Sequence, residues 1–369
     1  MRRNSKFHLI ILILLCFTCC NSNRNIPEDS WIKIRVDPTM ELFCTIHRLA
    51  NTGQDATNEL PNYIDEIEDY FEPFRNHRAV KLAHKLWETH RINVSALTTL
   101  IVYLNEPPEL IAKNKLNPLP PELDSRWTVD IIPELINAAG EFSKDTKFMQ
   151  FFDQQQQLYD RSVNNLYNSL KNENMLGWFK SYFGHVPDNY TIIIGMQNGF
   201  GNYGASISQR DGTKEFFSII GAHSPFFWSD VPRFSSSWLI PIVTHEFCHP
   251  YINPLVTKHS ERLKESGEII FSYHEAKLAK IGCLYWNHMM NEYIVRACVI
   301  RYFQAREDNK AVDRQIRLDE KHGFIGIRGL ADIFDEYESD RDKYPSIDAF
   351  MPQIAIYFDN YTESLQSGI

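Results

Sequence analysis

Four short segments of the chain have the side-chain patterns of β-strands: either an alternation of apolar and polar residues or a short apolar run. Residues 31–36 alternate between apolar and polar side chains, and residues 191–196 form an apolar run that is rich in isoleucine. Residues 203–208 and 215–221 are two further runs, joined by a segment with an Asp-Gly dipeptide, which is favoured in tight hairpin turns. Such runs predict strands. We therefore expect one four-stranded sheet that unites the first run with the other three.

Over most of the remaining chain, apolar residues recur at the spacing of an α-helix. This pattern predicts helices over residues 40–50, 63–89, 131–139, 142–171, 283–307 and, in two pieces, 328–369. The prolines between residues 105 and 121 exclude a continuous helix there. The fold class that follows is α+β, predominantly helical with a small mixed β-sheet.

Length and charge restrict the classes of protein to which this chain can belong. Its 369 residues suffice for about two domains, and the pattern changes near Met175 from mostly helical to strand-rich. We expect an N-terminal, mostly helical region over residues 31–175 that contributes one strand, and a second region over residues 176–369 that ends in helices. The formal net charge of −9 argues against a nucleic-acid partner, because nucleic-acid sites are basic.

The first 30 residues have the features of an export signal. Residues 1–19 begin with three basic side chains and continue with a short apolar run that cannot span a bilayer. Cys20 and the polar tether over residues 20–30 make the segment similar to a bacterial lipoprotein signal, in which Cys20 (or else Cys19) carries the lipid. An ordinary secretory signal is the alternative. Either signal predicts export, to the cell envelope (outer membrane or periplasm) with a lipid anchor in the membrane, or into the medium.

A His-Glu-x-x-His motif at residues 245–249 points to a metal site. On a helix, His245 and His249 lie on one face, one turn apart, so their imidazoles can share a single metal ion. Glu246 is rotated by about 100° from His245, which is where a general base must stand to polarise a water beside the metal. The residues around the motif are apolar, and buried polar groups without partners are unfavourable. A metal ion would supply those partners.

Two prolines set the expected ends of this helix. Pro241 is tolerated in a first turn, so the regular helix should begin near Ile240. Pro250 disfavours a helical conformation at His249, so the helix should end or kink just after the second histidine.

Two histidines do not complete a catalytic zinc site, which takes three protein ligands and keeps one position for water. The predicted helix over residues 283–307 carries Glu292, whose carboxylate would close a His/His/Glu site if this helix packs antiparallel to the first. Arg296, one turn later, would hold the carboxylate in place. The residues alone leave other third ligands open: His259, His274, Glu275 and His288.

The motif, followed by Asn291-Glu292 on a later helix, resembles the glutamate-zincin metallopeptidases. In its extended form over residues 245–254, the chain resembles the DUF4932 family of Bacteroides-type bacteria, which is grouped with these peptidases. The resemblance implies a zincin-like fold, with the small sheet next to the motif helix. It implies one Zn²⁺ per chain, bound by His245, His249 and Glu292, with Arg296 and Asn291 behind the ligands. Pro250 departs from many zincins and leaves the exit of the helix open.

The resemblance implies that the protein hydrolyses peptide bonds with a metal-activated water. In this reaction Glu246 would be the general base, and the substrate would be a peptide or protein. The oxyanion needs a second donor besides the metal, and four side chains are candidates: Tyr273, His274, Tyr285 and His288. In zincins the substrate lies along an exposed edge strand, for which the sequence offers Tyr203, Gly204, Ala205 and Ser206.

Two other functions compete with a peptidase. One is a surface lipoprotein without catalytic activity that binds a protein or a glycan on a zincin fold. The presence of Glu246 argues against it, because a degenerate site would be free to lose the base. The other is a zinc amidase that acts on a cell-wall linkage, which shares the metal chemistry and differs in its pocket.

Overall fold

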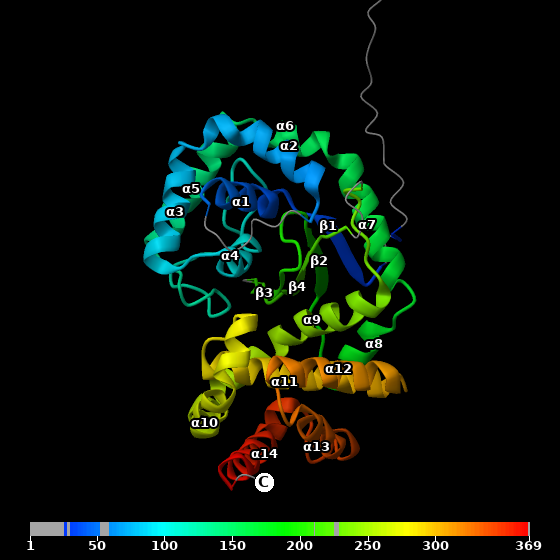
Figure 1. Cartoon of the computed structure of the whole chain (residues 1–369). Coiled ribbons are helices and arrows are strands. Elements are labelled where there is room, and N and C mark those ends of the chain that lie inside the picture. Colours follow the sequence, from blue (N-terminus) through cyan, green and yellow to red (C-terminus); the bar gives the residue numbers. More distant parts are fainter. Residues whose placement is uncertain (1–25, 28–29, 52–58, 210, 225–228, 368–369) are drawn as a thin grey trace, which may run out of the picture.

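A computed structural model of the chain describes residues 26–27, 30–51, 59–209, 211–224 and 229–367 (Figure 1). The elements in chain order are β1 (Ile32–Val36), α1 (Pro38–Leu49), α2 (Pro61–Phe71), η1 (Glu72–Phe74), α3 (Arg78–His90), α4 (Val94–Ile101), α5 (Ile131–Asp145), α6 (Phe148–Gln154), α7 (Gln156–Leu170), α8 (Met175–Phe183), β2 (Asn189–Gly195), β3 (Asn202–Ser208), β4 (Lys214–Gly221), α9 (Ser236–Lys258), α10 (Ser260–Leu278), η2 (Ala279–Ile281), α11 (Trp286–Ala305), α12 (Asn309–His322), α13 (Ile327–Ser339) and α14 (Ile347–Ser367).

The four strands form one mixed sheet in the order β1-β2-β4-β3. β1 pairs with β2, and β2 with β4, in parallel, whereas β3 pairs antiparallel with β4 through the hairpin at Gly212. Nearly all of β2 is buried, as expected for a strand with neighbours on both sides. β3 stands at one edge of the sheet. The predicted α+β fold, mostly helical with a small mixed sheet, is confirmed.

The sheet separates two groups of helices (Figure 1). Helices α1 to α7 arch over one side of it, and α9 runs along the other side against β3 and β4. α11 packs on α9, and α10, α12, α13 and α14 follow beyond it. α9 is therefore enclosed between the sheet and a second helical layer.

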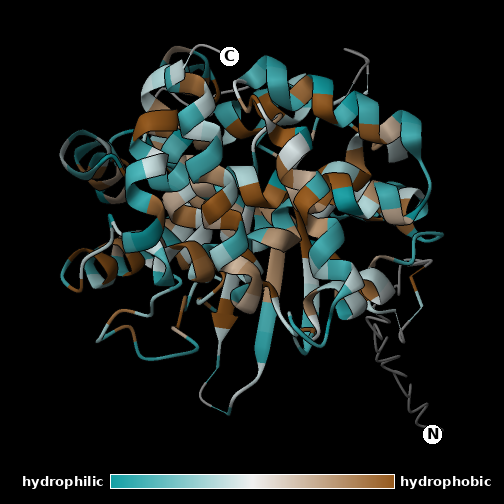
Figure 2. Ribbon diagram, turned by 90° about the horizontal axis from the view of Figure 1, so that it is seen from below, coloured by the Kyte–Doolittle hydropathy of each residue, from teal (hydrophilic) through white to brown (hydrophobic). Residues whose placement is uncertain are grey.

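Aromatic packing holds α9 against the sheet. Phe247, within the motif, lies edge-on to Tyr190 of β2, with ring centroids 4.9 Å apart. One turn later Tyr251 stacks on Phe183 of α8 at 3.9 Å and donates a hydrogen bond to the carbonyl of His185. Helices at the surface carry both hydrophobic and hydrophilic residues, as expected of amphipathic helices that cover a core (Figure 2).

Several predicted helix boundaries are wrong. α9 begins at Ser236 rather than near Ile240, and it continues through Pro250 to Lys258. The predicted helix over residues 142–171 spans three helices, α5, α6 and α7. Lys147, with a positive φ of 54°, separates α5 from α6, and Gln155 separates α6 from α7. The prediction over residues 63–89 spans α2 and α3, which are separated by a 3-10 turn.

The predicted signal and lipid anchor lie outside the described residues. Residues 1–25, Cys20 included, are in that part of the chain, so export and lipidation stay predictions. Among the residues that the structure describes, no helix has the length and apolar character needed to cross a bilayer.

Candidate metal centre

The motif helix α9 remains regular although it contains three prolines. Pro250 has no amide hydrogen to donate to the carbonyl oxygen of Glu246, one turn earlier. That carbonyl faces β3: a Cβ atom added to Gly204 would lie only 2.4 Å from it and 3.0 Å from Cβ of His249. The missing side chain of Gly204 thus lets the edge strand approach the helix where the motif ends. Packing on both sides of α9 offsets the lost helical hydrogen bond.

Three side chains from two helices converge on one point beside this contact. Nε2 of His245 and Nε2 of His249 lie 3.1 Å apart on α9. Glu292, on α11, places Oε2 at 3.5 Å from His245 Nε2 and Oε1 at 3.4 Å from His249 Nε2. One ligand atom from each residue falls within 4.8 Å of the others. The three residues form a group that could hold a metal ion.

Glu292 is oriented by charges behind it. Arg296, one turn later on α11, donates to Glu292 Oε2 from Nε at 3.1 Å and from Nη2 at 2.8 Å. Its Nη1 donates at 2.6 Å to Asp319 of α12, whose carboxylate is fully buried. Asp319 in turn accepts two hydrogen bonds of 3.0 Å from Gln315. This chain of partners fixes the carboxylate and leaves Oε1 facing His249.

The orientation of His249 is fixed by a partner on its own helix. Nδ1 of His249 lies 3.1 Å from Oδ1 of Asn253, one turn later. An amide oxygen only accepts hydrogen bonds, so Nδ1 carries a proton and Nε2 is the ring nitrogen left to face the other two side chains. Metal-binding histidines are commonly held in this way by a hydrogen bond to the other ring nitrogen.

The donor set fits a divalent transition metal. Two imidazole nitrogens and one carboxylate oxygen, buried together and supported from behind, are the usual protein ligands of catalytic zinc. The ligand atoms of a hard-cation site would instead be mostly oxygens. The geometry supports a metal-binding group at these three residues, and the identity of the metal belongs to the proposal below.

Burial and charge shift the pKa values of these groups in different directions. Burial lowers the pKa of His245. Burial alone would do the same to His249, but the Glu292 carboxylate raises the pKa of His249 to about 9. Burial acts to raise the pKa of Glu292, yet the charges of His245 and Arg296 hold that pKa well below its usual range. Glu292 therefore stays ionised, as a metal ligand must be.

Glu246 follows His245 directly and is also buried, 6 % exposed. Burial raises the pKa of Glu246 to about 7, with a further rise from the charge of Glu292 and opposing effects of His249 and Arg296. A carboxylate whose pKa lies near neutrality can both take up and release a proton at physiological pH.

The four candidate oxyanion donors lie in different places. His288 is the one in contact with the metal-binding group: its Nε2 lies 3.7 Å from Glu292 Oε1, and its side chain is 45 % exposed. His274 instead bonds to the hydroxyl of Tyr361 on α14, at 3.1 Å. Tyr273 and Tyr285 are 53 % and 68 % exposed. An oxyanion role for any of the four stays a prediction.

Other residues that the sequence offered for the site also have definite places. His259 bonds to Asp348 of α14 at 2.8 Å, and Glu275 is exposed on α10, so neither joins the three ligands. Asn291 precedes Glu292, but its Oδ1 is buried without a hydrogen-bond partner among the described residues. A role for Asn291 behind the ligands stays a prediction.

Three supporting residues are not among those predicted from the sequence. Asn253 had a usable signal, because it stands four positions after His249 and so shares its helix face. Asp319 and Gln315 had none, since they lie on α12, a helix that was not predicted, and their link to Arg296 exists only in the folded chain.

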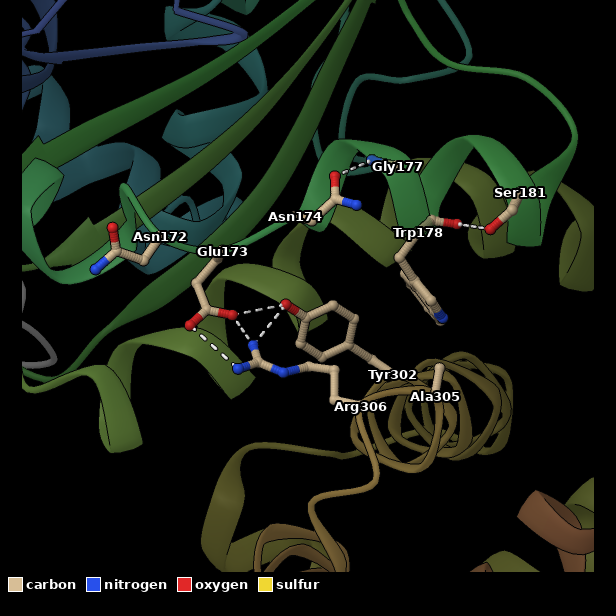
Figure 3. Close-up of a pocket in the computed structure, with 9 residues that line it drawn as sticks. All are labelled: Asn172, Glu173, Asn174, Gly177, Trp178, Ser181, Tyr302, Ala305 and Arg306. Atoms are coloured by element: carbon tan, nitrogen blue, oxygen red, sulfur yellow. Dashed lines mark hydrogen bonds and ion pairs between the residues drawn. The ribbon is translucent and has the colours of Figure 1, made fainter.

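A separate pocket of about 620 Å³ lies between α8 and the C-terminal end of α11 (Figure 3). Its charged groups neutralise one another: Arg306 forms an ion pair with Glu173, and Tyr302 donates to the same carboxylate at 3.2 Å. Arg306 follows Glu292 by about four helical turns, roughly 20 Å along the axis of α11. The pocket is therefore not part of the metal centre.

Comparisons with known proteins place the chain in a family. A search of curated proteins and a search of solved structures found no match. The profile of one family matches residues 122–356, which include the metal-binding group, β2 to β4 and the whole of α5 to α13. The match covers more than half of the 369 residues. The chain belongs to the family described as Domain of unknown function (DUF4932).

Proposed function

We propose that this protein is a zinc-dependent metallopeptidase with a zincin-like fold. The observation that carries the proposal is the convergence of His245, His249 and Glu292 beside the buried carboxylate of Glu246. A structural role alone would not require two imidazoles and two carboxylates in one buried cluster, because buried charged groups are unfavourable unless they are paired. The small sheet next to the motif helix supports the zincin comparison.

Zinc held by the three ligands would supply a Lewis acid that polarises both a water molecule and the carbonyl of the scissile bond. Glu246 takes a proton from the attacking water and passes it to the leaving amine. Its pKa of about 7 suits both steps, since about half of the carboxylate is ionised at neutral pH and the protonated form remains a usable acid. We assign the hydrogen bond to the developing oxyanion to His288, because its Nε2 lies 3.7 Å from Glu292 Oε1.

The edge strand β3 offers the means of holding a peptide. Among the described strands it pairs with β4 alone, and an edge strand of this kind can accept an added strand along its outer side. Gly204, in the middle of β3, lies against Glu246 and His249. A peptide that extends the sheet along β3 would therefore pass the metal-binding residues.

Metal analysis of the purified protein and of single variants tests this proposal. We expect about one zinc per chain in the wild type and a large loss in His245→Ala. Glu246→Gln should retain zinc and lose peptide cleavage by roughly 10²- to 10⁴-fold, the usual contribution of a general base. Glu275→Gln, an exposed carboxylate on α10, is the matched control and should change neither zinc content nor cleavage.

Digestion of a broad peptide library, with and without a chelator, separates this function from its competitors. Chelator-sensitive cleavage supports a peptidase. A wild-type protein that binds no metal, or that binds zinc and cleaves nothing, would falsify the enzyme proposal. Hydrolysis of purified peptidoglycan without cleavage of any peptide would instead indicate an amidase.

A further inference from the structure

A group of aromatic side chains, one of them exposed, lies at the N-terminal end of β3, the end away from the hairpin. Phe200 precedes β3 and is 58 % exposed, although it is one of the largest apolar side chains. The ring centroid of Phe200 lies 4.5 Å from that of His223, which follows β4. The ring centroid of His223 lies 4.7 Å from that of Trp238, in the first turn of α9. We call these three residues the aromatic platform. They come from three separate elements and meet at one place.

The turn that presents Phe200 is held in a fixed position. The side chain of Asn202 donates to the carbonyl of Phe200 at 3.0 Å and accepts from the amide of Gly221 at 3.1 Å. A Cβ atom on Gly221 would lie 2.3 Å from the carbonyl of Gly199, so the turn packs directly on the end of β4. An exposed phenylalanine on a braced turn is a preorganised contact surface rather than a loose loop tip.

Trp238 of the platform lies on the same face of α9 as the two metal-binding histidines. Trp238 stands seven positions before His245, which is two turns of α9 and about 10 Å along its axis. Trp238, His245 and His249 thus form one stripe on α9. Burial lowers the pKa of His223, so its imidazole is neutral at physiological pH and the platform carries no charge. Its surface suits an apolar side chain.

We propose that the aromatic platform binds a large apolar or aromatic side chain of the peptide substrate, at about the third residue after the scissile bond. This inference rests on the proposed function and adds a substrate preference to it. β3 runs from the platform towards Gly204 and the metal ligands. A peptide that adds antiparallel to β3, the commoner pairing, therefore runs from the ligands to the platform. It advances about 3.3 Å per residue, so about three residues span the 10 Å.

Two peptides that differ only in phenylalanine or alanine at the third residue after the cleavage point test the inference. Wild type should cleave the phenylalanine peptide with a kcat/KM about tenfold higher, the size of one good aromatic contact. Phe200→Ala should reduce this ratio to about twofold or less. Phe200→Leu, which keeps an apolar side chain, should retain most of the preference. Ile356→Ala, a similarly exposed residue on α14, is the matched control.

Binding of the same peptides to zinc-loaded Glu246→Gln provides a readout that does not require turnover. We expect the dissociation constants to differ about tenfold in that background and the difference to vanish when Phe200→Ala is added. If wild type cleaves no peptide, the proposed function has failed, and equal binding of the two peptides then overturns the platform as well. The inference is also overturned if Phe200→Ala keeps the wild-type preference, or if the preference lies before the scissile bond.

Discussion

Arg296 donates two hydrogen bonds to a single oxygen of Glu292, at 3.1 and 2.8 Å, while the other carboxylate oxygen faces His249. The guanidinium therefore supports the oxygen that faces His245 and leaves the oxygen that faces His249 free of its hydrogen bonds. It also bridges Glu292 to the fully buried Asp319, so two carboxylates depend on one cation.

Replacement of this cation should weaken both the metal centre and the fold. In Arg296→Gln we expect a zinc dissociation constant roughly ten- to hundredfold higher, as for other residues behind metal ligands. We also expect about 3–5 kcal/mol less stability, because two buried carboxylates lose their partner. Competition with a chromogenic chelator and urea unfolding measure the two effects. Arg317→Gln, on the exposed side of α12, is the control, and equal behaviour of the two variants would contradict this role of Arg296.

The hydrogen bond from His249 to Asn253 makes a second prediction about the metal. Asn253→Leu removes the acceptor that keeps the proton on Nδ1, so Nε2 is no longer held as a lone-pair donor. The zinc dissociation constant should rise roughly ten- to hundredfold. Asn253→Asp preserves an acceptor at the same position and should bind zinc about as well as wild type. Zinc titration of both variants decides the matter, and a weak Asp variant beside an unaffected Leu variant would exclude the tautomer argument.

The sequence predicts those parts of the site that follow from local periodicity. His245 and His249 share a helix face whatever the rest of the chain does, and Glu292 with Arg296 repeats the one-turn spacing on a second helix. The four strands could likewise be found, because each is a short run bounded by turn-forming residues. What local spacing cannot give is the angle at which α9 and α11 pack, which brings Glu292 to the two histidines.

The errors in the predicted helices have identifiable physical causes. Prolines 241, 250 and 254 argue locally against α9, but contacts with the sheet on one side and α11 on the other outweigh the lost hydrogen bonds. Lys147 adopts a left-handed conformation that usually favours glycine or asparagine, so nothing in its type announces the break after α5. The charged helix α12, which carries Asp319, has no counterpart among the predicted helices.

Gly204 is where the edge strand and the motif helix come closest, and a methyl group there should separate them. In Gly204→Ala the new Cβ would lie 2.4 Å from the carbonyl oxygen of Glu246, so the backbone of β3 or α9 must shift. We expect a loss of about 1–3 kcal/mol in unfolding free energy, as for other overpacked sites. Zinc affinity should fall as well, because the new Cβ would also lie 3.0 Å from Cβ of His249, a metal ligand in the proposal. Ser206→Ala, two residues along the same strand, should show neither effect in urea unfolding and zinc titration.

The buried carboxylate of Glu41 predicts a pH dependence of stability that is separate from the metal centre. Glu41, on α1, accepts hydrogen bonds from the amide of Met196 at 2.8 Å and from the hydroxyl of Tyr63 at 2.9 Å. Burial raises the pKa of Glu41 from 4.5 to about 7, against the effect of these hydrogen bonds. Met196 lies at the start of the turn that leads to Phe200, so this network also supports the aromatic platform.

The sign of the effect follows from the direction of that shift. Because the folded protein holds the Glu41 proton more tightly than the unfolded chain does, stability from this group is complete below pH 4.5 and is lost as the pH rises towards 7. The loss is about 3 kcal/mol at most. Urea unfolding of wild type and Glu41→Gln between about pH 5 and pH 8 measures it, since the variant cannot ionise there. The difference in unfolding free energy between the two proteins should shift against wild type across this range. Parallel pH profiles would mean that Glu41 is ionised in the folded protein, and that the turn before the edge strand is held by a charged network instead of a neutral one.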